Sequence, residues 1–311
     1  MKTVKKILKW ATLVLIILLT GIAGITASRQ HVKYEAPYPG IHASKDTAVI
    51  AKGKHLVYSI AHCNACHNKE NTESLLETGE DIPLTGGFVF DLPVGKIYSR
   101  NITPDKETGI GKYTDGEIAR MLRYGVRPDG TAAFDFMPFH NLSDEDLTAI
   151  ISYLRAQKPV RNEVPANKLN LLGNVVNAFM VKPVGPSEEI LPSVKPDSTA
   201  SYGRYLVTNV ANCSGCHTTR DISGSFTGSL LAGGKLEENG ITFLPPNLTP
   251  HPESRIYGWT QDMFINRFRM GRAIKNSPMP WNNFKHMSDL ELKAIYKYLQ
   301  TVQPMPTNKA G

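Results

Sequence analysis

Cysteine is scarce in this sequence. The 311 residues contain four cysteines, and all of them lie in two short segments, residues 63–66 and 213–216. No cysteine lies at the end of the apolar N-terminal stretch, which excludes a lipid-modified cysteine as the means of attachment there. Any role of cysteine in this protein must therefore be explained by those two segments.

The excess of positive charge is small outside the N-terminal segment. The formal net charge is +7, but four lysines within residues 1–28, a segment without acidic residues, supply four of these charges and leave +3 for the rest. Proteins that bind nucleic acid show a basic patch or stripe. No such stripe is left in the body of this chain, so we expect no nucleic-acid partner.

Charged residues are missing altogether from Trp10–Ala27. As a helix this run is about 27 Å long, close to the thickness of a bilayer core. The lysines before it predict a cytoplasmic N-terminus and a body on the periplasmic side of the inner membrane. The alternative is a cleaved signal sequence, although Ile25-Thr26-Ala27 is a poor cleavage site. We favour residues 1–28 as a single-pass anchor, and both interpretations predict export.

The two cysteine segments have the same pattern, Cys-x-x-Cys-His, at Cys63–His67 and Cys213–His217. This spacing is typical of covalent haem c, in which two thiols form thioethers with the vinyl groups and the histidine binds the iron. The pattern therefore predicts two covalent haem c groups. Their thioether residues are Cys63, Cys66, Cys213 and Cys216, and their first axial ligands are His67 and His217.

The cysteine pairs alone are also compatible with three other uses. A redox disulfide, simple structural disulfides or one zinc ion held by four thiolates would each use the cysteines. All three leave the two histidines unexplained, and a shared zinc would join segments about 150 residues apart. Covalent haem accounts for both residue types.

An internal repeat surrounds the two motifs. Six features of the first copy recur in the same order in the second, with offsets of 142 to 150 residues. Repeats of this kind indicate duplication of one structural unit. The pairs include Gly53 and Gly203, Gly86-Gly87 and Gly233-Gly234, Asn101–Pro104 and Asn247–Pro250, Met137–Phe139 and Met279–Trp281, and Ser143 and Ser288. We expect one domain at residues 46–157 and another at 198–303.

Signals for helices dominate both copies, so we expect an all-α fold of two tandem domains after the N-terminal transmembrane helix. Thr114 with Glu117 predicts a capping box, and Gly125 a helix C-terminus. The serines at 143 and 288 predict the start of the last helix of each copy. Gly53 and Gly203 lie inside helical patterns, where glycine costs about 1 kcal/mol. Close approach of that last helix would explain them.

The region between the copies, residues 158–197, contains six prolines. Proline at this density disfavours a long helix and indicates a linker. Within it, Leu169–Val181 is apolar but too short to span a membrane. We expect this segment to pack across both domains.

The second axial ligand decides what each iron can do, since methionine favours electron transfer and an open position permits catalysis. Met137 and Met279 are each followed by proline and an aromatic residue at equivalent positions of the repeat. Proline fixes the backbone of an irregular loop, so we expect these two methionines to bind the irons. His140 and His62 are competitors, but neither has a histidine counterpart in the second copy.

Aromatic residues gather near both predicted ligand loops. We expect them to cover the haem faces and exclude water, or to serve as ordinary core. They are Phe134, Phe136, Phe139, Trp281 and Phe284.

Taken together, these segments resemble the class I cytochrome c family. The resemblance rests on the helix leading to Cys-x-x-Cys-His, the Asn-x-Thr-Pro loop, the Met-Pro loop and the closing Tyr-Leu helix, over about residues 46–303. More narrowly, the chain is similar to the membrane-attached multihaem cytochrome c subunits of bacterial alcohol dehydrogenases. Those subunits typically carry three haems, whereas this chain has two motifs.

The resemblance implies a dihaem cytochrome c that relays single electrons and makes no bonds itself. Its expected partners are redox proteins of the membrane or periplasm: a dehydrogenase, a quinol-oxidising complex or a terminal oxidase. The alternative is a dihaem enzyme such as a cytochrome c peroxidase, which needs one open iron position and is disfavoured by two matched Met-Pro loops. A haem-based sensor is disfavoured because no signalling segment is recognised after residue 303.

Overall fold

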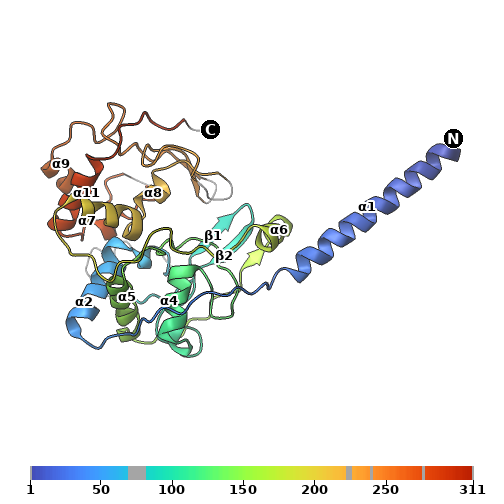
Figure 1. Ribbon diagram of the computed structural model, residues 1–311, viewed down its shortest axis with the longest axis horizontal. Helices are drawn as coiled ribbons and strands as arrows, with labels where there is room; N and C mark the ends of the chain where they lie inside the picture. The colour runs from blue at the N-terminus through green and yellow to red at the C-terminus, as the bar shows by residue number, and fades with distance from the viewer. Residues whose placement is uncertain (1, 69–81, 222–225, 239–240, 275–276, 310–311) are drawn as a thin grey trace.

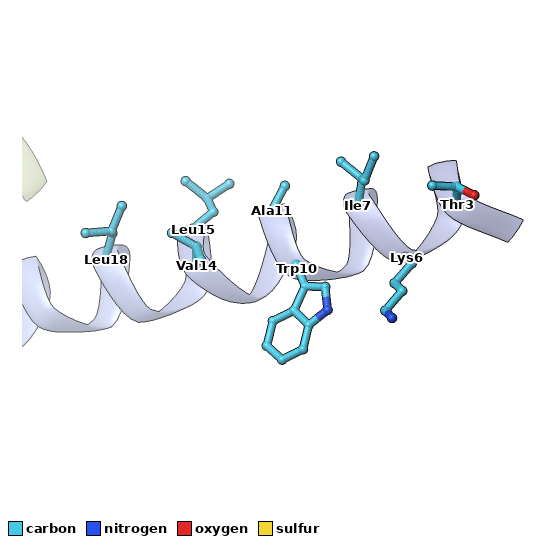
Figure 2. Close-up of a pocket in the computed structure, with 8 residues that line it drawn as sticks. All are labelled: Thr3, Lys6, Ile7, Trp10, Ala11, Val14, Leu15 and Leu18. Atoms are coloured by element: carbon cyan, nitrogen blue, oxygen red, sulfur yellow. The ribbon is translucent and has the colours of Figure 1, made fainter.

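A computed structural model describes residues 2–68, 82–221, 226–238, 241–274 and 277–309 (Figure 1). Helix α1, Lys2–Ser28, projects away from the rest of the protein (Figure 1). Its segment Thr3–Ser28 has a mean hydropathy of 2.2 and is long and apolar enough to cross a membrane. Figure 2 shows Trp10 on one side of this helix and Ile7 and Leu15 on the other. Apolar side chains thus point outward on opposite sides of this helix.

The first half of the body is built on two packed helices. Helix α2, Thr47–His55, continues into a π-helical turn, η1, Leu56–Ile60, and packs against α5, Asp144–Ala156. A Cβ added to Gly53 would lie 1.9 Å from the carbonyl oxygen of Ala149. The predicted close approach of the last helix to this glycine is confirmed.

The second half repeats this arrangement. Helix α7, Ala200–Tyr205, continues into the π-helical turn η4, Leu206–Val210, and packs against α11, Asp289–Leu299. A Cβ added to Gly203 would also lie 1.9 Å from a carbonyl oxygen, that of Ala294. In each copy a glycine therefore allows the first helix and the closing helix to touch through their backbones.

A third helix of each half lies between the motif and the ligand loop: α4, Asp115–Tyr124, and α9, Gln261–Arg269. The predicted capping box of Thr114 with Glu117 is formed, and Gly125 ends α4 with φ +64°. Left-handed backbone at a helix C-terminus favours glycine. The shorter helices are η2 Cys63–Ala65, η3 Ile110–Lys112, α8 Cys213–Cys216 and α10 Trp281–Phe284.

The starts of the two closing helices also follow the sequence signals. Ser288 and Glu291 form a reciprocal capping box at α11. At α5, Ser143 accepts a hydrogen bond from the Asp146 N–H. The predicted apolar face of α5 is buried, and its members are Leu147, Ile150, Ile151 and Leu154.

The expectation of an all-α fold is wrong for two small antiparallel sheets. Strands β1, Val89–Leu92, and β2, Gly95–Tyr98, form a hairpin, and β3, Lys168–Leu169, pairs with β2. Strands β4, Leu236–Glu238, and β5, Ile241–Phe243, form a second hairpin. Both hairpins lie between a Gly-Gly turn and an Asn-x-Thr-Pro loop, where runs of three or four residues are too short to read as strands from their pattern.

One hydrophobic core runs through both halves. Tyr205 of α7 is buried between them, and its hydroxyl donates to Asp146 Oδ2 at 2.6 Å and accepts from the Ser143 N–H at 3.1 Å. His55 of α2 hydrogen-bonds through Nε2 to Glu291 of α11 at 2.9 Å. The two halves therefore share buried side chains and are joined by more than the connecting chain.

The proline-rich segment 158–197 contains one short helix, α6, Leu171–Phe179. The expectation that Leu169–Val181 packs across both halves is wrong. Helix α6 instead contacts the end of α1 and the turn between β1 and β2 (Figure 1). Gly173 explains this position, because a Cβ there would lie 1.9 Å from the Val94 carbonyl oxygen. The apolar residues of this segment remain largely exposed, with Leu171 at 82%.

Candidate functional site

Both Cys-x-x-Cys-His segments are approached by the same irregular backbone. The turns η1 and η4 are π-helical, and each is followed by a residue in the left-handed region, His62 with φ +38° and Asn212 with φ +50°. π-Turns and left-handed non-glycine residues are uncommon and cluster at functional sites. The repeated irregularity starts the cysteine segment of each half in the same way, as η2 and α8.

None of the four cysteines, all of which the structure describes, forms a disulfide. Burial raises the pKa of the Cys63 and Cys213 thiols to about 12. Among the described residues no three His, Cys, Asp or Glu side chains converge as a metal site would need. The disulfide and shared-zinc alternatives therefore find no support in the arrangement of these side chains.

The imidazoles of His67 and His217 are held in the same way. His67 Nδ1 lies 2.7 Å from the Arg100 carbonyl oxygen, and His217 Nδ1 lies 2.8 Å from the Pro246 carbonyl oxygen. A carbonyl oxygen only accepts, so Nδ1 carries the proton and Nε2 keeps its lone pair. Burial lowers the pKa of both histidines, which favours this neutral form. Metal-binding histidines are typically oriented by such a bond.

The Asn-x-Thr-Pro loop supplies the carbonyl group that orients each histidine. Arg100 and Pro246 are the residues directly before Asn101 and Asn247. Asn101 Oδ1 accepts from the Thr103 N–H and hydroxyl at 3.0 and 2.7 Å, and its Nδ2 donates to the Val160 carbonyl at 2.8 Å.

Asn247 repeats these bonds in the second half. Its Oδ1 accepts from the Thr249 N–H and hydroxyl, both at 2.8 Å, and its Nδ2 donates to the Met305 carbonyl at 2.8 Å. Each asparagine is buried, with 2% of its surface exposed. The loop that sequence reasoning used only as a marker of the repeat therefore fixes the backbone beside each histidine.

The Gly-Gly turns hold the other side of each histidine. Gly86 N–H donates to the His67 carbonyl at 3.0 Å, and Gly233 N–H donates to the His217 carbonyl at 2.9 Å. Their φ angles are +70° and +75°. A Cβ on Gly86 would lie 2.4 Å from the Arg100 carbonyl carbon, so the turn has no space for a side chain.

The two predicted ligand loops have matching backbones. Phe139 N–H donates to the Met137 carbonyl at 2.8 Å, and Trp281 N–H donates to the Met279 carbonyl at 2.7 Å. With φ −76° and ψ +62° at Pro280, this is an inverse γ-turn. Both methionines are half-buried and pack against the same core as Cys63 and Cys213. Binding of iron by these methionines remains a prediction.

The competing histidines are engaged elsewhere. His140 Nδ1 lies 3.1 Å from the Arg123 carbonyl oxygen, and its Nε2 lies 2.9 Å from Asp135 Oδ1. His62 Nδ1 lies 3.1 Å from the Ile60 carbonyl oxygen, and its ring packs edge-on against Phe284. Both nitrogens of His140 are therefore occupied by protein oxygens.

Sequence reasoning missed an arginine that anchors each ligand loop. Arg123 donates to the Leu142 carbonyl at 2.7 Å and to Asp144 Oδ1 at 2.5 Å. Arg269 donates to the Lys285 carbonyl and to Asp289 Oδ1, both at 2.6 Å. Each arginine lies two residues before the glycine that ends its helix, and each aspartate follows the capping serine. This shared spacing is the signal that could have identified them.

The predicted aromatic residues divide between exposed and buried positions. Phe136 stacks on Phe90 of β1 with ring centroids 4.7 Å apart and is 43% exposed. Trp281 is buried beneath the guanidinium of Arg267, whose central carbon lies 3.6 Å from the ring centroid. Apolar walls of this kind restrict access of water to a cofactor.

Comparisons with known proteins show which proteins this chain is similar to. Residues 200–303 match the cytochrome c family model. The chain is 30% identical to the fructose dehydrogenase cytochrome subunit of Gluconobacter japonicus, over 84% of this chain and 54% of that protein. It is also 30% identical to the cytochrome c subunit of the quinone alcohol dehydrogenase of Gluconobacter oxydans, over 85% and 57%. The chain thus spans little more than half the length of these two relatives.

A third relative is similar in length. The chain is 25% identical to a protein of Cereibacter sphaeroides described as diheme cytochrome c-type, over 92% of this chain and 95% of that protein. The alignments with all three relatives extend well beyond the segment matched by the family model, into the first half of the chain.

Proposed function

We propose that this chain belongs to the cytochrome c family, which its matches support, carries two covalent haem c groups and relays single electrons between redox proteins. In this proposal Cys63 and Cys66 bind one haem, and Cys213 and Cys216 bind the other. The irons are ligated by His67 with Met137 and by His217 with Met279. The domains keep the predicted limits, 46–157 and 198–303, with the linker 158–197 between them.

The observation that carries the proposal is that His67 and His217 make the same hydrogen bond through Nδ1, one in each half of the protein. In both halves Nδ1 donates to a backbone carbonyl that a buried asparagine loop holds, so Nε2 is the nitrogen available to iron. Haem supplies a one-electron change at iron when it is bound. The protein's part is to keep both rings in one orientation and to limit the entry of water. Neither task requires a residue that makes or breaks a bond in a substrate.

A dehydrogenase is the proposed electron donor, since two relatives bear the names of dehydrogenase cytochrome subunits. A quinol-oxidising complex or a terminal oxidase is the proposed partner at the other end. We further propose that α1 anchors the chain in the inner membrane with its N-terminus in the cytoplasm, because four lysines precede the apolar run. The haem-binding body then lies on the periplasmic side.

An absorption and redox titration of the purified protein, with carbon monoxide and peroxide added separately, tests this function. We expect two covalently bound haems, both six-coordinate in each oxidation state and unreactive toward both additions. A rapid reaction with peroxide would contradict the role of electron carrier and favour the peroxidase alternative. Covalent haem stays on the chain after denaturation. If only one of the two motifs retained haem in this way, the protein would carry one covalent haem per chain and the proposed number of two would be wrong.

A further inference from the structure

Helix α6 is amphipathic in the wrong sense for a helix of a soluble surface. Gly173 and Ala178 are buried, and the middle residues Asn174–Asn177, which include two valines, are half-buried. The apolar residues at both ends of the helix, including Met180 directly after it, are exposed. The exposed fractions are 82% for Leu171, 50% for Leu172, 42% for Phe179 and 51% for Met180. A helix in contact with water places its apolar face on the protein.

This orientation is fixed by packing. Gly173 lies against the Val94 carbonyl, and no side chain would fit there. Asn170 caps the helix by accepting from the Gly173 N–H at 2.9 Å and donates from Nδ2 to the Pro93 carbonyl at 2.7 Å. The helix cannot roll its apolar face inward without breaking these contacts.

Helix α6 is also joined to the end of the membrane-spanning helix. Gln30 Nε2 donates to the Asn174 carbonyl at 2.8 Å, and Arg29 Nε donates to the Ala178 carbonyl at 2.9 Å. The Arg29 guanidinium lies 5.4 Å from the centroid of the Phe179 ring. Figure 1 shows α6 beside the point where α1 enters the body.

The position of α6 along α1 coincides with the end of the apolar run. No charged residue lies between Lys9 and Arg29. Those nineteen residues span about 28 Å as a helix, close to the thickness of the hydrocarbon core. Arg29 and Gln30, which directly follow α1 and contact α6, therefore lie where the hydrocarbon core gives way to lipid headgroups.

Charge around α6 also suits this boundary. Lys168 and Lys182 flank the helix, Arg29 lies beside it, and residues 164–187 contain no acidic side chain. Lysine and arginine next to an apolar helix face favour a surface of anionic phospholipid.

We propose that α6 lies in the membrane interface, with Leu171, Leu172, Phe179 and Met180 inserted among the acyl chains of an anionic bilayer. This proposal rests on the proposed role of α1 as an anchor and adds a second membrane contact. A lone helix leaves the body free to swing, whereas two contacts set its orientation. The partner surface of the haem domains is then presented at a fixed height above the membrane.

Photocrosslinking of the full-length holoprotein tests the contact. Three variants each carry one photoreactive benzophenone residue, Leu172→p-benzoylphenylalanine on α6, Leu15→p-benzoylphenylalanine on α1 and Met263→p-benzoylphenylalanine on α9. The native side chains are similarly exposed, at 50%, 55% and 49%. Each variant is reconstituted in vesicles of phosphatidylcholine and phosphatidylglycerol, irradiated, and analysed for lipid adducts by mass spectrometry.

We expect lipid adducts at positions 15 and 172 and none at position 263. Adducts at 15 without adducts at 172 would overturn the α6 contact and leave the anchor intact. A covalent dimer formed through position 172 would assign the face to a second copy of the chain and likewise overturn the proposal. Absence of lipid adducts at both 15 and 172 would remove the anchor together with the α6 contact.

Discussion

The side-chain amide of Asn283 donates to Asn64 Oδ1 at 2.6 Å and joins the two halves of the protein. Asn64 lies between the first pair of cysteines, and Asn283 lies four residues after Met279. The same amide also donates to the Tyr58 carbonyl at 2.7 Å. The segment that would attach the first proposed haem thus touches the proposed ligand loop of the second. We expect this contact to provide a short route through bonded atoms for electrons between the two sites.

Replacing Asn283 by alanine removes both bonds. Asn64 is 1% exposed, so its buried Oδ1 loses this donor, and the Tyr58 carbonyl loses the other hydrogen bond. We expect the free energy of unfolding to fall by about 1–3 kcal/mol. The rate of electron exchange between the haems should also fall. This rate can be measured in the holoprotein after a flash has reduced one of the two haems.

Asn141 is the matched control, because it holds the same position after Met137 and bonds to Ser187 at the surface. Asn141→Ala should leave the exchange rate unchanged and cost less stability. Equal slowing in both variants would show that the bridge to Asn64 has no special role.

The asparagine loops should tune the two potentials separately. Asn101→Ala loosens the Arg100 carbonyl that orients His67, and a weaker bond at Nδ1 makes the imidazole less electron-donating. We expect one reduction potential to rise in a potentiometric titration while the other stays. Asn247→Ala should raise the other potential instead. A rise of both potentials, or of neither, would contradict this assignment.

Close packing at the repeated glycines predicts opposite signs for similar substitutions. Gly53→Ala and Gly203→Ala each place a methyl group within 2 Å of a carbonyl oxygen. We expect chemical denaturation to show a loss of about 1–3 kcal/mol from overpacking. Gly116→Ala in α4 is the control, since its Cβ would lie 3.6 Å from the Tyr38 ring and should stabilise by about 0.5–1 kcal/mol. Similar losses at all three positions would argue against backbone contact as the cause.

The methionine assignment predicts a selective opening of each haem. Met137→Ala should remove the methionine signature of one haem from the absorption spectrum and allow that haem to bind carbon monoxide, because its iron loses a ligand. Met279→Ala should do the same at the other haem. Met263→Ala is the control on the exposed face of α9. If Met137→Ala leaves the spectrum unchanged, another residue is the ligand.

Stability should depend on pH through the contact between His55 and Glu291. The hydrogen bond to Glu291 raises the pKa of His55 above its usual value of 6.5. The protonated form is therefore favoured in the folded state, and its stabilisation is full below pH 6.5 and lost as the pH rises through the raised pKa. We expect the stability difference between the native protein and His55→Gln to shrink on going from pH 5.5 to 8.5.

Glu291→Gln provides the matching partner variant. Glutamine keeps the capping box with Ser288, which accepts either residue at this position, but removes the charge. This variant should lose the same pH dependence. A difference between His55→Gln and the native protein that stays constant over the range would exclude the ion pair as its source.

The features that sequence reasoning predicted correctly are those that depend on neighbours in the chain. The capping box at Thr114, the C-terminus at Gly125 and the apolar face of α5 each arise within one helix. Gly53 could be interpreted because its equivalent, Gly203, recurs before the same motif. Local chemistry and repetition were sufficient for these elements.

Apart from the close approach of helices at Gly53 and Gly203, features that depend on distant contacts were missed. The carbonyl that orients His67 comes from 33 residues further on, and Asn64 meets Asn283 across 219 residues. No periodicity marks either pairing. The position of α6 differs from the prediction for another reason. The prediction placed its apolar residues against protein, whereas the contacts of Gly173 and Gln30 turn the small and polar side of the helix toward the body.

The hydrogen bonds of the buried Tyr205 hydroxyl have a consequence for how the two halves unfold and whether they can be separated. Because the Tyr205 side chain of α7 bonds to the first turn of α5 and the core is continuous, we expect the two halves to unfold as a single cooperative unit. Cleavage within 158–165 should leave the fragments associated, and neither copy can be exchanged for an unrelated module without rebuilding the face it shares. We therefore expect a destabilising substitution in either half to lower the stability of the other half as well.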